Sequence, residues 1–103
     1  MKPKTITDLF TFDTTYLTDF KAEQYGKLIH INGLINNATS NVTITASDSV
    51  RSRIGYATKA LNYSGWSNSV QRQVNVVLSG NNITIDCGGA YQYTAFDIWY
   101  LTN

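Results

Sequence analysis

Residues 27–35 read Lys-Leu-Ile-His-Ile-Asn-Gly-Leu-Ile and predict a β-strand, because β-branched and apolar side chains dominate them. Successive side chains of a strand point to opposite faces. One face therefore carries Ile29, Ile31, Gly33 and Ile35. The other, mixed face carries Leu28, His30, Asn32 and Leu34. Such a strand is typical of a sheet that packs against a second sheet, with Gly33 marking either a bulge or a close backbone approach.

The second half of the chain predicts three more strands. Residues 70–78 alternate between apolar and polar side chains, and Ser79–Asn82 predicts a hairpin turn because Gly and Asn tolerate positive φ. Ile83, Ile85 and Cys87 then return along one face, and Gly88-Gly89 ends that strand. Residues 91–101 predict a long terminal strand. Its two faces are Tyr91/Tyr93/Ala95/Asp97/Trp99/Leu101 and Gln92/Thr94/Phe96/Ile98/Tyr100.

The first half and the middle are less regular. We expect a polar lead-in over residues 1–8, a short strand at Leu9–Phe12, an apolar cluster from Tyr16 to Phe20, and a polar turn at 21–26. A turn at 36–39 predicts a hairpin between the strand at 27–35 and its partner at 42–46. A short strand is expected around Ile54 and Tyr56, and a loop over 59–69. Six to eight short strands without a helix predict an all-β fold, a small antiparallel β-sandwich or jelly roll.

Composition limits the classes of function. The 103 residues suit one domain, residues 1–103, and 43% hydrophobic residues can supply a core. The net charge of +1 predicts no nucleic-acid partner, and no apolar run is long enough for membrane insertion. The single cysteine excludes an intrachain disulfide, and no apolar segment follows Lys2 as a signal peptide would require. The domain is also compatible with being the C-terminal part of a longer protein.

The order of these strands carries a resemblance. Gly26–Gly33 is followed by an irregular middle, then by Val74–Leu78, the turn Ser79–Asn82, Ile83–Ile85 and a terminal Trp99-Tyr100-Leu101. This pattern resembles the C-terminal head domains of receptor-binding and baseplate proteins from phages of Gram-positive, lactococcal-type hosts. It covers about Gly26 to Leu101. The middle loop of that family commonly carries a proline motif, whereas the one proline here is Pro3.

The resemblance implies a location and partners. Such heads are typically homotrimers on the virion, at the phage tail tip or baseplate, and they bind bacterial cell-wall saccharide near subunit interfaces beside other tail proteins. Their sugar-contacting residues vary too much to be transferred to this chain. The site residues must therefore come from the sequence itself.

No catalytic constellation stands out. His30, the one histidine, could pair with Asp48, Asp86 or Asp97, and the spacing selects none of them. Asp86 and Asp97 are the best candidates for a glycosidase carboxylate pair, although strand aspartates usually face solvent. One His and one Cys do not make a four-ligand zinc site within a chain. We expect no enzyme activity, no metal and no cofactor.

Saccharide binding fits the composition better, because sugar rings stack on aromatic side chains and their hydroxyls pair with polar groups. Tyr63, Trp66 and Asn68 place aromatic and amide groups in the expected loop. Arg51 and Arg53 could grip a phosphate on the polymer, and His30 lies on a mixed strand face. The alternatives remain that Trp66 belongs to the core or a subunit interface, that the arginines are merely solvated, and that Tyr91, Tyr93 and Trp99 line the core or an intersubunit seam.

The leading hypothesis is a non-enzymatic, trimeric phage head that adheres to host saccharide. One alternative is a structural baseplate adaptor that docks another tail protein. Another is a monomeric carbohydrate-binding module of a secreted hydrolase.

Overall fold

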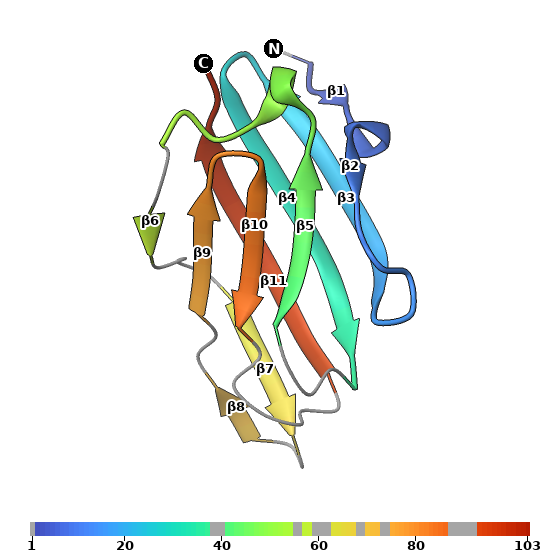
Figure 1. Cartoon of the computed structure of the whole chain (residues 1–103). Helices are drawn as coiled ribbons and strands as arrows, with labels where there is room; N and C mark the ends of the chain where they lie inside the picture. Colours follow the sequence, from blue (N-terminus) through green and yellow to red (C-terminus); the bar gives the residue numbers. More distant parts are fainter. Residues whose placement is uncertain are drawn as a thin grey trace.

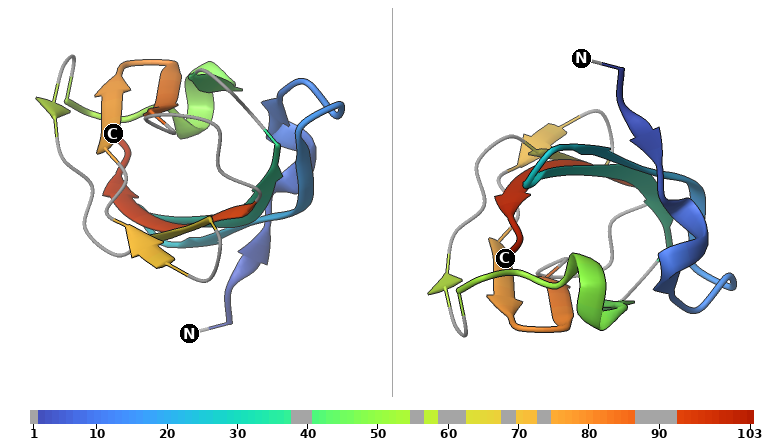
Figure 2. Two further views of the ribbon diagram at one scale, coloured as in Figure 1. Left: turned by 90° about the horizontal axis from the view of Figure 1, so that it is seen from below. Right: turned by 90° about the horizontal axis from the view of Figure 1, so that it is seen from above.

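The computed structural model describes residues 2–37, 41–54, 57–58, 63–67, 70–72, 75–86 and 93–103, with side chains in all of these ranges except 57–58, 63–67 and 70–72. Within these ranges the chain forms two antiparallel sheets that face each other as a sandwich (Figures 1 and 2). The predicted all-β sandwich is confirmed. No helix in the described ranges is long and apolar enough to cross a membrane.

The larger sheet has six strands in the described residues, in the order β1-β3-β4-β11-β7-β8. Their bounds are β1 Lys4–Thr5, β3 Leu17–Tyr25, β4 Leu28–Asn36, β11 Tyr93–Leu101, β7 Tyr63–Ser67 and β8 Val70–Arg72. The smaller sheet has the order β2-β5-β10-β9-β6. Its bounds are β2 Phe10–Thr11, β5 Val42–Ala46, β10 Asn82–Asp86, β9 Asn75–Ser79 and β6 Ala57–Thr58. Two 3₁₀ turns, η1 Thr7–Leu9 and η2 Asp48–Val50, complete the described elements.

The core lies between the sheets and follows the predicted alternation. On β4 the buried side chains are Ile29, Ile31 and Ile35, and on β11 they are Thr94, Phe96, Ile98 and Tyr100. The smaller sheet contributes Val42, Ile44, Val76, Ile83 and Ile85 to the same core. The predicted turn between β9 and β10 is also confirmed: Ser79 pairs with Asn82, and Gly80 has a φ of +60°.

Gly33 is a point of close approach. A Cβ atom at this position would lie 2.9 Å from Cζ of Phe96 and 3.1 Å from Cδ1 of Leu17. Phe96 is the direct cross-strand partner of Gly33, so its ring covers the space that a side chain would fill. The irregularity lies on the neighbouring strand, where the β3 register shifts between Thr18 and Lys21 and Asp19 has a φ of +56°.

One prediction near the N-terminus was wrong and two were incomplete. Residues 21–25 belong to β3 rather than to a turn, because they pair with β4 along their length and bury Ala22. The lead-in is also partly structured: β1 pairs with the end of β3, and Ile6 is buried. Of the strand expected at Leu9–Phe12, only Phe10–Thr11 is a strand, because Leu9 belongs to η1.

The predicted hairpin between 27–35 and 42–46 was wrong as well. Both edges of β4 are occupied, by β3 and by β11, so β5 cannot pair with it. Instead β5 crosses to the smaller sheet and lies between β2 and β10. Asn36, expected in a turn, is the last residue of β4.

The middle of the chain differs from its prediction in three places. The strand expected at 70–78 is two strands in different sheets, β8 and β9, separated by residues 73–74, which lie outside the described residues. The loop expected at 59–69 contains β7. The short strand expected around Ile54 and Tyr56 is β6, at 57–58, and Ile54 itself lies in an exposed bend. The residues outside the described ranges include Tyr56, Cys87 to Gly89 and Tyr91.

Candidate functional site

Exposed apolar side chains gather on the outer face of β11. Tyr93, Trp99 and Leu101 are 44%, 45% and 44% exposed, and they alternate with the buried residues of the same strand. Among the described residues, the other exposed large hydrophobic side chains are Tyr16, before β3, and Ile54, in a bend. A concentration of exposed apolar residues on one rigid strand is a feature of interaction sites.

The strand register builds rows of side chains across this face. Trp99 of β11 lies opposite His30 of β4, which lies opposite Glu23 of β3. The next row contains Asp97, Asn32 and Lys21, and the row on the other side contains Leu101, Leu28 and Tyr25. Directly paired residues of an antiparallel sheet project to the same side, so these rows form one continuous outer surface.

Trp99 is held by its neighbours. The imidazole of His30 stacks on the indole with a centroid separation of 3.9 Å and an interplanar angle of 8°. The ring of Tyr25 lies 5.9 Å from the indole at a tilt of 36°. His30 covers one face of the indole. The part of Trp99 that is exposed to solvent is therefore the part of the ring that His30 does not cover. We call Tyr25, His30, Asp97 and Trp99 the platform.

Asp97 gives the platform a polar edge. Its Oδ1 is hydrogen-bonded to Nε2 of His30. Because an ionised carboxylate can only accept, the histidine tautomer that fits this contact is the one that donates from Nε2. The carboxylate side chain is 51% exposed and that of His30 only 16%. Within the described part of the chain, the side chain of Asp97 has no further hydrogen-bond partner, which leaves Oδ2 available to accept from a ligand.

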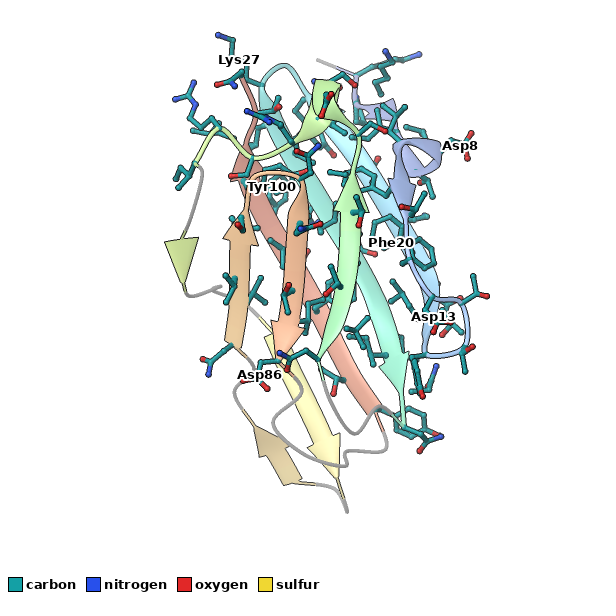
Figure 3. The ribbon with its side chains drawn as sticks, in the orientation of Figure 1. Asp8, Asp13, Phe20, Lys27, Asp86 and Tyr100 are labelled. Carbon is teal, nitrogen blue, oxygen red and sulfur yellow. The ribbon has the colours of Figure 1, made fainter. Side chains whose placement is uncertain are left out.

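The structure selects one of the three candidate carboxylates for His30, namely Asp97. Asp48 instead accepts from Nδ2 of Asn81 at 2.8 Å. Asp86 ends β10, in the other sheet, at the end of the sandwich opposite Lys27 (Figure 3). Asp86 and Asp97 are therefore not carboxylates of one cleft, and the carboxylate pair considered for a glycosidase is not formed. In the residues with described side chains, no serine, threonine or cysteine is hydrogen-bonded to His30 as a nucleophile would be, and no three potential metal ligands cluster.

The other predicted site residues lie elsewhere. Arg51 and Arg53 are exposed at the end of the sandwich, on either side of Ser52, which bridges to Thr102. Nη1 of Arg51 donates to Oδ1 of Asn81 at 3.4 Å, and the backbone N–H of Arg53 donates to the carbonyl of Leu101 at 2.8 Å. The two arginines therefore lie at the end of the sheet that carries the platform, and in the described part of the chain neither is hydrogen-bonded to a platform residue.

Tyr63 and Trp66 belong to β7, where the register pairs them with Phe96 and Tyr93 of β11, and their side chains are not described. Asn68 lies outside the described residues. Of the residues chosen from sequence as ligand-binding candidates, the structure thus places His30 in the platform.

The sequence pattern does not identify Tyr25 or Trp99 as ligand-binding residues, and it presents Asp97 only as a candidate catalytic carboxylate. The alternation in 91–101 had placed Trp99 and Asp97 on one face, but this face was interpreted as core or subunit seam. The core interpretation is wrong for Tyr93 and Trp99, which are exposed. Asp97 was the available signal, because an aspartate in the middle of an alternating strand face marks the side that meets solvent.

No family model, curated protein or solved structure matches this chain.

Proposed function

We propose that this domain is a non-enzymatic binding head that adheres to bacterial cell-wall saccharide, at the tip of a phage tail or in its baseplate, and that its contact site is the platform. The observation that carries the proposal is the half-exposed indole of Trp99 on a paired strand, stacked on His30 and bordered by the carboxylate of Asp97. The strand pattern that resembles phage head domains supports the location.

The platform offers the two kinds of contact that sugars need. The C–H faces of a pyranose ring stack on an indole, and the sugar hydroxyls donate to a carboxylate such as Asp97. The stack on His30 restricts the Trp99 side chain before any ligand arrives. Less conformational entropy is then lost on binding than for an aromatic residue on an unrestrained loop.

A single platform on an open sheet face buries little of its ligand, so its affinity is expected to be modest. Adhesion would rest on multivalency: three heads in a homotrimer, and many such trimers on one particle, convert weak single sites into strong avidity. A binding head of this kind requires no cofactor, and its partners are the host saccharide and the neighbouring tail proteins.

A second candidate function is a structural adaptor that docks another tail protein through the same face. The exposed Leu101 and Tyr93 beside Trp99 favour it, because exposed apolar residues also mark protein interfaces. The two functions differ in their ligand. Only the binding head is competed by a soluble polysaccharide.

The test compares the binding of fluorescently labelled domain to intact cells of a panel of Gram-positive strains. Wild type is expected to bind, purified cell-wall polysaccharide to compete, and Trp99→Ala to abolish binding while Trp99→Tyr retains part of it. Thr45→Ala, on the exposed face of the smaller sheet, is the matched control and should bind like wild type. Trp66→Ala tests the position that was chosen from sequence. Unchanged binding by folded Trp99→Ala would contradict the site, and no binding to any strain by a verified trimer would favour the adaptor.

A further inference from the structure

We infer that the site extends from the platform along β11 to Tyr93 and forms a track for a linear, neutral polysaccharide. The inference rests on the proposed saccharide-binding function and adds the class of ligand. Tyr93 and Trp99 are exposed to the same extent on the same face of one strand. They are six positions apart along the strand, which corresponds to about 20 Å. A single sugar ring cannot touch both side chains, whereas a chain of linked rings can.

The surface between the two aromatic residues carries small, apolar and polar side chains but no other aromatic one on β11 or β4. On β11 only Ala95 and Asp97 project between them, and Ala95 is small and exposed. On β4 the neighbouring side chains of this face are Leu34 and Asn32, both half-buried. Among the side chains of β11 and β4, no large one therefore stands in the path of an extended chain, and Asp97 and Asn32 offer hydrogen-bonding groups along it. On its other side the path is bordered by β7, where Ser64 pairs with Ala95 and Trp66 with Tyr93.

The charges of this face favour a neutral polymer. Asp97 borders Trp99, Glu23 lies in the same row as Trp99, and Lys21 is the one lysine in these rows. A polyanion stacked on Trp99 would lie beside the exposed Asp97 carboxylate and be repelled. Hydroxyl groups, in contrast, can donate to that carboxylate. Arg51 and Arg53, which were considered for phosphate recognition, lie at the end of the sheet beyond Leu101 instead of along the track.

A second copy of the chain fits this face less well. The centres of protein interfaces are depleted of charged residues. A copy covering β11 from Trp99 to Tyr93 would bury Asp97, with Lys21 and Glu23 two strands away. A hydrated sugar chain leaves these groups in contact with water or with hydroxyls. The distribution of charge therefore favours the polysaccharide over a homotypic contact.

The test uses neutral polysaccharide from the cell wall of a strain to which the domain binds, hydrolysed and separated by length, with teichoic acid from the same strain. Affinity by calorimetry should rise with fragment length until the fragment spans the track, and then level off. Tyr93→Ala should weaken binding of the long fragments about tenfold or more and leave the shortest fragments unchanged. Trp99→Ala should weaken binding of both.

A further variant tests the path between the aromatic residues. Isoleucine at position 95 suits a strand but is larger than alanine and would project into the path of the polysaccharide. Ala95→Ile should therefore weaken the binding of long fragments more than that of short ones. Circular dichroism confirms folding of each variant. Equal affinity for all lengths, or an unchanged affinity of Tyr93→Ala for long fragments, would overturn the track and leave the saccharide site standing. Tighter binding of teichoic acid would overturn the neutral ligand.

Failure of the proposed function gives a different result. In that case neither cells nor any fragment binds, and sedimentation shows a homo-oligomer that Trp99→Ala or Tyr93→Ala dissociates. This outcome would overturn the track together with the saccharide site and assign the face to a second copy.

Discussion

His30 and Trp99 face each other directly across β4 and β11 and stack almost in parallel, with their ring centroids 3.9 Å apart. The same imidazole is hydrogen-bonded to Asp97, two residues before Trp99 on the same strand. His30 thus connects the aromatic surface and the carboxylate of the platform. Its contribution to ligand binding can be measured separately from its contribution to the stability of the fold.

Replacing His30 by alanine should affect binding more than folding. The pair with Asp97 and the stack with Trp99 lie at the surface, and such contacts contribute about 1 kcal/mol. Saccharide binding should weaken further, because the indole loses the ring that restricts it. Urea unfolding measures the effect on stability, and titration with the polysaccharide that the domain binds measures the effect on affinity. Asp97→Asn is the companion variant, because it removes the charge but keeps an oxygen that can accept a hydrogen bond. A loss of several kcal/mol in stability would show that the pair holds the sheet together.

Gly33→Ala should destabilise the fold by about 1–3 kcal/mol, because the added methyl group meets the Phe96 ring at 2.9 Å. The cause can be isolated with Phe96→Leu, which removes the ring. Gly33→Ala should cost less in that background than in the wild type, and denaturant unfolding of the four proteins gives the coupling free energy. Equal costs in the two backgrounds would mean that Phe96 is not the obstacle.

Tyr100→Phe should also lower stability, by about 1–3 kcal/mol, because a buried acceptor loses its donor. The hydroxyl of Tyr100 donates to the backbone carbonyl of Val50 at 2.6 Å and connects β11 to η2. Denaturant unfolding measures the loss. The control is Tyr16→Phe, which removes the hydroxyl of an exposed tyrosine. A Tyr100→Phe variant as stable as wild type would contradict the role of this bond.

The same residue makes stability depend on pH in alkaline solution. Burial raises the pKa of Tyr100 above its usual value near 10. Above about pH 10 the unfolded chain releases this proton while the folded chain retains it, so the unfolding free energy falls as pH rises. The contribution is fully present below pH 10. Tyr100→Phe should reduce the fall of the unfolding free energy between pH 9 and 11. Denaturant unfolding at a series of pH values measures this slope, and a slope equal to that of the wild type would contradict the prediction.

Asp13 should titrate below the usual range for aspartate. The backbone N–H of Thr15 donates to its carboxylate at 2.9 Å, and this bond, followed by one from the Thr15 side chain, lowers the pKa of Asp13. A lowered pKa stabilises the fold above about pH 4, and this contribution is lost as the pH falls through the folded-state pKa. Carboxyl chemical shifts measured by NMR check the direction. In Thr15→Ala, which retains the backbone donor, the pKa should recover only in part; a full return to the unfolded value would contradict the order of the causes.

Local patterns determined which face of most strands is buried. The alternation in 27–35 specifies the inward side of that strand, and the alternation in 93–101 divides the strand into two faces without deciding which is buried, because the direction of a strand side chain depends only on its position in that strand. The turn at Ser79–Asn82 could be predicted for a similar reason. The positive φ that such a turn requires is adopted by Gly80, which lies within the turn itself. In the structure β4 and β10 bury the predicted faces, and β11 keeps the predicted division into two faces.

Pairing partners could not be read in this way. Residues 21–25 are too polar to predict a strand, and they form one because β4 pairs with them. The pattern in 70–78 predicts one strand, but the structure divides these residues between two sheets. The platform depends on the same long-range information. The sequence alone determined that Trp99 and Asp97 share a face of one strand and that His30 lies on the mixed face of another. Only the tertiary structure decided that these faces adjoin in a register that places His30 against both, because register is set by contacts between segments distant in the chain and not by the pattern within either one.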